Sequence, residues 1–390
     1  MNRPSKSICF VNPLTLFGTV GGAEVQIYYL AAEALKRNWS VSYVTQPEQI
    51  PKQIPEELRR DFRFIPFDQS GDEKKDLAGM SQVLTSIDAD LYYQRGRKLW
   101  TWFTGEFARK SGKPLIYAAS MDLDCKKHKF VFRRTGGLKA VYKNISRMSG
   151  DRKLDKLTLQ GIHQASQILA QTEQQKTGFK KNLGLESLLF PNIHPVPESA
   201  SIVKSSPPVV LWLATVKAWK QPEVFIRAAE NLQHLSCRFI LAGQLSDSRL
   251  IDPIRKAEAS LNNFEYHPDI SFEESNRLIG RASLFVNTSR NEEGFPNTYI
   301  QAWLRQTPTL TLRFDPDEVI QKHRLGEHCG SVRRLEKAIE SYIESPQKRQ
   351  EAGKRARHYA IEHHGLEKKA EDFFELAARL TASPSRPSVH

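Results

Sequence analysis

The sequence predicts an α/β protein made of two Rossmann-like domains that face a central cleft. In both halves of the 390-residue chain, short apolar runs typical of buried parallel strands alternate with helical patterns. A proline-rich stretch separates the halves, with five prolines among residues 191–208. Such a stretch is typical of an interdomain linker. Two βα-repeating halves on either side of a linker favour two ligand-binding sheets over one large core.

The first half begins with an apolar strand at residues 8–11, which Asn12-Pro13 ends. After a glycine loop, apolar residues recur at helical spacing from Ala23 to Leu35. The further elements expected here are strands at 41–44, 62–67, 91–93, 115–118 and 168–170, and a helix at 157–165.

The second half repeats this alternation after the linker. The expected elements are strands at 209–213, 238–242, 284–286 and 309–312, and helices at 223–232 and 253–261. We therefore expect the first domain to span residues 1–195 and the second to span 196–365. A last helix, over about residues 366–385, is expected to return to the first domain.

The cysteine pattern and the N-terminus indicate a cytoplasmic protein. The four cysteines are scattered and form no Cys-x-x-Cys pair, which suits a reducing compartment and no disulfide framework. No run of 18 apolar residues predicts a membrane-spanning helix. Residues 1–6 lead directly into a strand, without the apolar core of a signal peptide.

The net charge is +13, and the excess is concentrated in one segment. Residues 126–156 hold eleven Lys or Arg against two Asp, with Phe130, Val131 and Phe132 among them. A basic segment with interleaved apolar residues is typical of an anionic membrane surface, which predicts a peripheral position on the inner face of the membrane. A solvated loop and helix is the alternative. No nucleic-acid-binding motif accompanies the charge, so we expect no nucleic acid partner.

The segment from Arg290 to Trp303 carries the strongest functional signal. It follows the strand at 284–286 and leads into a helical run that begins near Thr298. Gly294 allows a ligand to approach the backbone closely, and Pro296 suits the turn into the helix. The free N–H groups of the helix's first turn suit an anion, so the pattern predicts a phosphate-bearing ligand at the carboxyl end of a sheet. An ordinary strand-to-helix turn is the alternative.

Two other loops have the same strand–loop–helix setting. Gly21 and Gly22 precede the first long helix, where two glycines allow backbone to approach a phosphate. The spacing does not match the dinucleotide-binding fingerprint. In the second domain, Lys220 follows the strand at 209–213 and precedes a helix. A compact cation at that position can neutralise a diphosphate. The alternative for the glycine loop is a flexible turn, and the alternative for Lys220 is an ordinary surface lysine.

These three loops together resemble family 4 of the retaining glycosyltransferases, which has the GT-B fold. The residues on which the resemblance depends are Gly21-Gly22-Ala23-Glu24, Lys220, the Glu293-Gly294-Phe295-Pro296-Asn297-Thr298 run and Gln301-Ala302-Trp303. The resemblance implies that Lys220 and Glu293 are catalytic, with Lys220 gripping the leaving diphosphate and Glu293 contacting the transferred sugar. The substrate-binding residues that it implies are Gly21, Gly22, Thr215, Gly294, Phe295, Pro296, Asn297, Thr298 and Gln301.

The sequence departs from the family pattern at three places. Gln301 stands where the family has a second Glu, so its bonds to donor hydroxyls should be weaker. Thr215 stands where the family has an Arg, and Lys217 is a partial replacement. The family often has a His near the reacting carbon, but residues 117–124 contain none. Asp122 or Asp124 is expected to approach the acceptor hydroxyl there, unless these residues are caps or solvated.

The resemblance implies a retaining, hexosyltransferase-type glycosyltransferase. It would move a sugar from a nucleotide-sugar to a glycan or a lipid-linked acceptor, in polysaccharide or cell-surface glycan synthesis. We expect no cofactor beyond the donor and no metal, because the segments around His128 and His323 lack a tetrahedral ligand set. The alternative is a non-catalytic nucleotide-sugar-binding or glycan-binding protein with a degenerate site, which Thr215 and Gln301 favour.

Overall fold

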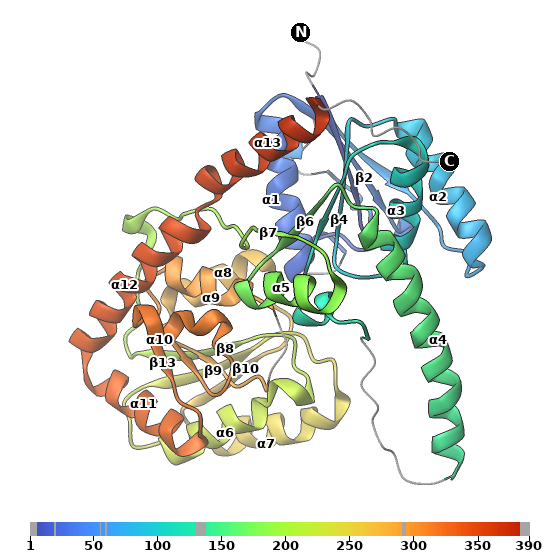
Figure 1. Ribbon diagram of the computed structural model, residues 1–390. Coiled ribbons are helices and arrows are strands. Elements are labelled where there is room, and N and C mark those ends of the chain that lie inside the picture. The colour runs from blue at the N-terminus through green and yellow to red at the C-terminus, as the bar shows by residue number, and fades with distance from the viewer. Residues whose placement is uncertain are drawn as a thin grey trace. The chain divides into compact units, whose positions relative to one another are not determined.

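The computed structural model describes residues 6–18, 21–54, 56–58, 61–128, 138–290 and 294–382, with the backbone alone for Glu57 and residues 138–149. The chain divides into two compact units, and each is a parallel sheet with helices between its strands (Figure 1). Unit 1 comprises Met1–Asn192 with Glu367–His390, and unit 2 comprises Ile193–Leu366. The predicted α/β class with two Rossmann-like halves is confirmed.

Unit 1 contains a seven-stranded sheet in the order β3-β2-β1-β4-β5-β6-β7. Every pair of neighbouring strands is parallel. The strands are β1 (Lys6–Val11), β2 (Trp39–Thr45), β3 (Phe62–Pro66), β4 (Leu91–Arg95), β5 (Leu115–Ala118), β6 (Gln167–Ala170) and β7 (Leu188–Leu189). The helices are α1 (Gly22–Lys36), α2 (Glu73–Ile87), α3 (Leu99–Ser111), α4 (Leu138–His163), α5 (Glu173–Gly178) and α13 (Leu366–Ala382).

The C-terminal helix α13 packs on the sheet of unit 1 through aromatic side chains. The ring of Phe374 lies 5.3 Å from that of Trp39, and the ring of Phe373 lies 5.9 Å from that of Tyr93. Edge-to-face pairs of this kind stabilise by about 0.5–1.5 kcal/mol beyond their buried area. The end of the chain therefore completes the core of the unit in which the chain begins.

Helix α4 is longer than the helix predicted at 157–165, and its amino-terminal half extends beyond the sheet of unit 1 (Figure 1). Its other half is held by two contacts. A Cβ on Gly161 would lie 2.2 Å from Thr101 O, so α3 and α4 meet where only glycine fits. The buried guanidinium of Arg97 forms an ion pair of 2.6 Å with Asp155 and donates to Thr158 Oγ1 at 2.8 Å. These contacts, which no local pattern reveals, hold the carboxyl half of α4 in unit 1.

Unit 2 contains a six-stranded parallel sheet in the order β10-β9-β8-β11-β12-β13. The strands are β8 (Val209–Leu213), β9 (Arg238–Ala242), β10 (Phe264–His267), β11 (Leu284–Asn287), β12 (Thr309–Thr311) and β13 (Gly326–His328). The helices are α6 (Pro222–Asn231), α7 (Ile251–Ser260), α8 (Phe272–Arg281), α9 (Asn297–Leu304), α10 (Val319–His323), α11 (Val332–Glu344) and α12 (Pro346–His364). Strands β8 and β9 have the predicted bounds.

Two hydrophobic clusters cover the two faces of the unit 2 sheet. Alternate residues of β8 supply them, since Val210 and Trp212 belong to one cluster and Leu211 and Leu213 to the other. This division is the reason that the strand reads as a continuous apolar run. Among the described residues, no helix combines the length and apolar character needed to cross a bilayer.

Candidate functional site

The strand order of unit 2 places a candidate site at the carboxyl ends of β8 and β11. These strands are neighbours at the centre of the sheet, and the order of the strands reverses between them. In open α/β sheets the loops that leave such a pair diverge to opposite faces and leave a crevice where ligands bind. The two loops here are residues 214–221 and 288–296, and they contain the motifs that the sequence singled out.

The Lys220 loop is a short helical turn, Ala218–Lys220, followed by Gln221 in the left-handed conformation with φ 50°. Pro222 is the first residue of α6. Lys220 is partly buried, and its Nζ lies 5.1 Å from the centre of the Trp219 ring, a distance that suits a cation–π contact. Thr215 and Lys217, also partly buried, lie in the same loop immediately after β8.

Thr288 ties this loop to the end of β11. Its hydroxyl is fully buried, accepts a hydrogen bond of 2.8 Å from Trp212 Nε1 and contacts Lys220 O at 2.6 Å and Gln221 O at 2.9 Å. A hydroxyl has one proton. Because Trp212 Nε1 can only donate, the Thr288 proton must go to one of the two carbonyl oxygens. The position of Lys220 is therefore fixed from the neighbouring strand, and the sequence analysis missed Thr288.

A second bond joins the same loops, because Arg290 N donates to Trp219 O at 3.2 Å. Beyond Arg290 the residues Asn291, Glu292 and Glu293 lie outside the described part of the chain. The predicted role of Glu293 therefore stays a prediction from the sequence.

The Gly294–Thr298 run forms the turn into α9. Gly294 has φ +73°, a conformation that other residues adopt at a cost, and Pro296 stands at the N-cap of α9. Phe295 is 5% exposed and packs on Trp303 and His364, with ring centres 5.9 Å and 4.8 Å away. Its side chain belongs to the core, so Phe295 shapes the loop. Thr298 lies in the first turn of α9 and is partly buried.

Asn297, the first residue of α9, is held by a buried histidine. His194 Nε2 lies 3.2 Å from Asn297 Oδ1, and His194 is 2% exposed. Burial lowers the pKa of His194 to about 3, so the ring is neutral at neutral pH. A carbonyl oxygen can only accept, so the proton of the ring is on Nε2. No local pattern signals this contact, because 103 residues separate the partners.

Gln301 lies on the α9 face that packs toward α8. The residue is 4% exposed, and its Nε2 donates to Asn276 Oδ1 at 3.1 Å. The amide is therefore oriented by a protein partner, and its carbonyl end is the acceptor that remains for a ligand hydroxyl.

The predicted residues of unit 1 divide into two groups. Gly21 is the extended N-cap of α1, and Gly22 is its first residue, at the carboxyl end of β1. Asp122 and Asp124 lie in a short turn after β5 and are buried. Asp122 Oδ1 accepts from Gln175 Nε2 at 3.0 Å, and Asp124 Oδ2 accepts from Ser120 N at 2.7 Å.

These bonds make Asp124 a cap of the turn and tie Asp122 to α5. Asp124 Oδ1 also accepts from Arg97 N at 3.2 Å. These contacts are those of the alternative named in the sequence analysis, in which the loop carboxylates act as caps. Within the described ranges, no three His, Cys, Asp or Glu side chains are grouped as metal ligands would be.

Comparison with known families places the unit 2 loops in context. Residues 198–359 match the model of the family described as glycosyl transferases group 1. This range contains the Lys220 loop, Thr288 and α9. A search of curated proteins gives no significant match to the chain.

Solved structures of similar fold span nearly the whole chain. Sucrose-phosphate synthase from Thermosynechococcus elongatus is 14% identical with a TM-score of 0.72, over 97% of this chain and 100% of the other. The Anabaena protein HepE, solved with UDP, is 16% identical with a TM-score of 0.70, over 96% and 100%. A glycosyltransferase from Rickettsia africae is 15% identical with a TM-score of 0.71, over 97% and 99%. The chain therefore has the GT-B fold.

The buried neutral ring of His194 predicts a loss of stability in acid. Its pKa in the folded protein, about 3, is below the ordinary value of about 6.5, so the unfolded chain binds the proton more readily. This contribution is complete above pH 6.5 and is lost as pH falls toward 3. Denaturant titrations should show that it removes about 2 kcal/mol of unfolding free energy by pH 5, at about 1.4 kcal/mol per pH unit.

The variant His194→Gln should be less stable at pH 7 but should lack this part of the pH dependence. The control is His234→Gln, which changes an exposed histidine and should keep the full pH dependence. If the unfolding free energy of His194→Gln depends on pH as strongly as that of the wild type, another group is responsible.

Proposed function

We propose that the protein is a retaining, hexosyltransferase-type glycosyltransferase that moves a sugar from a nucleotide-sugar to a glycan or lipid-linked acceptor in polysaccharide or cell-surface glycan synthesis. One observation carries the proposal. Thr288 and the Arg290–Trp219 bond hold the Lys220 loop against the loop that leads into α9, at the switch point of the unit 2 sheet. This arrangement lies inside the range that matches the glycosyltransferase family.

In the proposed mechanism, unit 2 binds the donor and stabilises its leaving group. The diphosphate would lie between Lys220 and the first turn of α9, where backbone N–H groups and the helix dipole favour negative charge. Fixed charges that face a developing anion lower the barrier without a nucleophile from the protein. Lys217 would supply a further cation in place of the Arg that Thr215 replaces.

The reaction proposed is substitution on the same face of the sugar. The bond from the anomeric carbon to the diphosphate oxygen breaks, and the acceptor oxygen bonds to that carbon. The acceptor proton passes to an oxygen of the departing phosphate, which makes the nucleoside diphosphate the other product. No metal or cofactor enters this scheme, and Glu293 would orient the hydroxyls of the transferred sugar.

Gln301 favours a second candidate, a non-catalytic nucleotide-sugar-binding or glycan-binding protein. Its amide is occupied on one side by Asn276 and has no charge, so it would bind ribose hydroxyls more weakly than a carboxylate does. Slow hydrolysis of a bound nucleotide-sugar, or transfer to an added acceptor, supports the enzyme. Tight binding without either reaction supports the second candidate.

We also propose that the segment 126–156 associates with an anionic membrane surface from the cytoplasmic side. Residues 129–137 lie outside the described part, and the side chains of 138–149 are not described. In the remaining part, Leu154 is 41% exposed among the exposed side chains of Arg152, Lys153 and Lys156. Asp155, on the opposite side of α4, is buried against Arg97. Residues 152–156 therefore expose three basic side chains and one apolar side chain, and Lys153 Nζ forms an ion pair of 2.6 Å with Glu73.

A thermal-shift screen of UDP, GDP and ADP, each with its nucleoside and its nucleotide-sugars, tests donor binding. A ligand that binds only the native state must raise the melting temperature. For the diphosphate that binds best, Lys220→Ala should weaken binding about tenfold or more in calorimetry, as loss of a charge-assisted bond of roughly 1.5–3 kcal/mol implies. Binding of the nucleoside should change much less.

Lys256→Ala, which removes an exposed lysine of α7, is the matched control and should bind both ligands as the wild type does. Equal losses for the diphosphate and the nucleoside in Lys220→Ala would contradict the assigned role. If no nucleotide or nucleotide-sugar stabilises the protein, the proposed function is wrong.

The tie between Thr288 and the Lys220 loop predicts that Thr288 positions the lysine. Thr288→Val keeps the shape of the side chain but leaves Trp212 Nε1 and a loop carbonyl without their partner. We expect the affinity for the nucleoside diphosphate to fall about tenfold with little change in nucleoside binding, and Thr288→Ser to restore it to within about threefold. A Ser variant as weak as the Val variant would show that packing, not the hydroxyl, matters.

The membrane proposal predicts salt-sensitive binding to vesicles rich in anionic lipid. Each basic side chain near such a surface contributes about 1 kcal/mol, and salt screens the attraction. The protein should sediment with the vesicles at low salt and be released at high salt. Replacing Arg133, Arg134 and Lys139 with Glu should abolish sedimentation and leave nucleotide binding intact.

The control is an equal charge reversal on exposed residues of unit 2, with Arg333, Lys337 and Lys354 replaced by Glu. This variant should still bind the vesicles if the segment 126–156 is the contact. If the wild-type protein does not bind anionic vesicles at low salt, the membrane proposal is wrong.

A further inference from the structure

Two helices of unit 2, α8 and α9, hold a pair of side-chain amides against each other. Asn276 lies on α8 and Gln301 on α9, and Gln301 Nε2 donates to Asn276 Oδ1 at 3.1 Å. Gln301 is 4% exposed, and Asn276 is partly buried. An amide has donors at one end and an acceptor at the other, so the neighbours of each end determine what is left for a ligand.

The orientation of the Asn276 amide is dictated by α8 itself. Its Nδ2 donates at 3.1 Å to the carbonyl oxygen of Phe272, one turn earlier in the helix. A carbonyl oxygen can only accept, so the nitrogen of Asn276 must face Phe272 and its oxygen must face Gln301. The opposite orientation would place two oxygens 3.1 Å apart.

The orientation of Asn276 in turn fixes that of Gln301. Because Asn276 presents its oxygen, Gln301 must turn its own nitrogen toward α8. No group of the described residues donates to Gln301 Oε1, and this atom is not among the buried side-chain atoms that lack a hydrogen-bond partner, so it reaches solvent. The end of the Gln301 amide that is left for a ligand is therefore its oxygen.

The two helices are also held together at their carboxyl ends. Lys204 Nζ donates to Ala282 O, after α8, and to Arg305 O, after α9, at 2.8 Å each. Its third bond, of 2.6 Å, goes to Thr307 Oγ1, so all three protons of the ammonium are used. The geometry of the amide pair is thus set before a ligand arrives, which lowers the entropic cost of binding.

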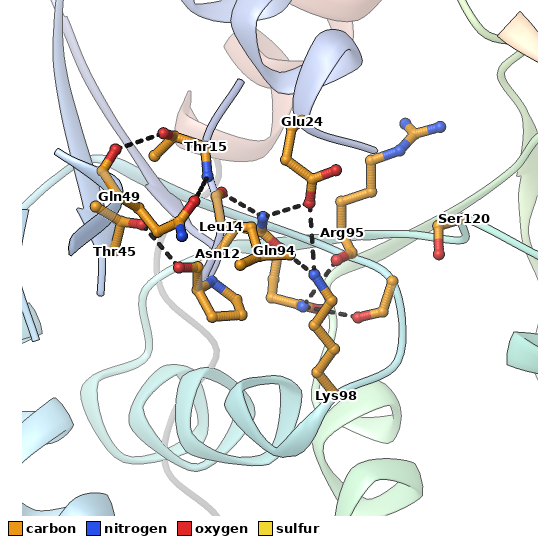
Figure 2. A network of polar contacts seen from close by, with 12 residues as sticks. Asn12, Leu14, Thr15, Glu24, Thr45, Gln49, Gln94, Arg95, Lys98 and Ser120 are labelled. Atoms are coloured by element: carbon orange, nitrogen blue, oxygen red, sulfur yellow. Dashed lines mark hydrogen bonds and ion pairs between the residues drawn. The ribbon is translucent and has the colours of Figure 1, made fainter. Parts of the chain in front are cut away.

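An amide of unit 1 provides a contrast, because both of its ends are occupied (Figure 2). Asn12 Nδ2 donates to Leu14 O at 2.7 Å and to Glu24 Oε1 at 3.1 Å. Asn12 Oδ1 accepts from Lys98 Nζ at 2.9 Å. This amide serves the fold alone, whereas Gln301 is oriented at its nitrogen end and keeps its oxygen for a ligand.

We infer that Asn276 is a positioning residue for nucleotide recognition, because it makes the uncharged amide of Gln301 present an oxygen to a ligand hydroxyl. The inference rests on the proposed function, in which that hydroxyl belongs to the ribose of the nucleotide-sugar. Asn276 and Gln301 are then a matched pair. A carboxylate in place of Gln301 would face the oxygen of Asn276, so a change at residue 301 alone would set two acceptors against each other.

Calorimetry of the nucleoside diphosphate that binds best, and of its 2′-deoxy and 3′-deoxy analogues, tests the positioning role. The wild type should bind the ribose form about fivefold more tightly than at least one analogue, as loss of one neutral hydrogen bond implies. Asn276→Ala frees the Gln301 amide to rotate, so the affinity for the ribose form should fall to that for this analogue. The affinity for the analogue itself should not change, whereas a merely structural defect would weaken both.

Asn276→Asp is the conservative variant. It keeps an oxygen facing Gln301 Nε2 and should keep the preference for the ribose form, although a carboxylate beside Phe272 O should make the protein less stable. The matched control is Asn231→Ala, which removes an exposed amide at the end of α6 that bonds to Glu336. This control should bind all three ligands as the wild type does.

A double-mutant cycle of thermal stability tests the pairing without a ligand. Gln301→Glu should lower the melting temperature of the wild type, because the new carboxylate faces the oxygen of Asn276. The same change in the Asn276→Ala background should lower it by at least about 2 °C less, because the opposing oxygen is gone. Equal shifts in the two backgrounds would overturn the inference.

The two measurements separate this inference from the proposed function. If the nucleotide binds but the wild type distinguishes neither deoxy analogue, or if Asn276→Ala keeps the wild-type preference, the inference is overturned and the proposed function stands. If no nucleotide binds, the proposed function is lost. Unequal shifts in the cycle would then keep Asn276 as the residue that orients Gln301 toward another hydroxyl-bearing ligand.

Discussion

The buried hydroxyl of Thr288 is the contact on which the candidate site of unit 2 depends. The loop that it holds contains Gln221 in the left-handed conformation, with φ 50°. A residue other than glycine in that region costs roughly 1 kcal/mol or more, and it persists only where its surroundings enforce it. The Thr288 contact to Gln221 O, backed by Trp212, supplies that enforcement. The contact of Thr288 with Lys220 O also fixes the backbone from which the Lys220 side chain extends. The strained conformation of Gln221 and the proposed role of Lys220 in binding the diphosphate therefore depend on the same hydroxyl.

The two units use one architecture with different charges at the central loops. In each sheet the order of strands reverses at the centre, and polar loops meet at the carboxyl ends. In unit 2 the first loop brings Lys217 and Lys220 to that edge, so an anionic ligand is favoured. In unit 1 the cation Lys98 is balanced by Glu24, which also covers the start of α1. The topology brings loops together at the same edge of each sheet, whereas a few side chains determine the charge at that edge.

The sequence predicted those features that local patterns determine. Residues 209–213 form an unbroken apolar run because both faces of β8 are buried, and the strand was found with its bounds. The positions of the Gly21, Lys220 and Gly294 loops followed from the strands before them. The anchoring of α4 did not follow, because it depends on the Gly161 contact with α3 and on the distant Arg97.

Contacts between residues far apart in the sequence account for the remaining differences. Thr288 and Lys220 are separated by 68 residues, and His194 and Asn297 by 103. Neither pair leaves a periodic or compositional trace. A loop carboxylate such as Asp124 reads equally well as a ligand group or as a cap until its hydrogen-bond donors are known. Here the backbone N–H groups of Ser120 and Arg97 are donors to Asp124, so the Asp124 carboxylate accepts hydrogen bonds from within the fold.

The segment that joins the two units is itself tied to the loop edges of both sheets. Asn192, the last residue of unit 1 before the crossing, accepts a hydrogen bond from the buried Arg95 at the end of β4. His194, two residues later, contacts Asn297 at the start of α9. Only Ile193, which is fully buried, separates these anchors along the chain. A shift of the first turn of α9 must therefore be absorbed by the backbone angles of very few residues. The neutral state of His194 belongs to this arrangement, because burial disfavours the charged ring and lowers its pKa, while Nε2 of the neutral ring still donates to Asn297 Oδ1.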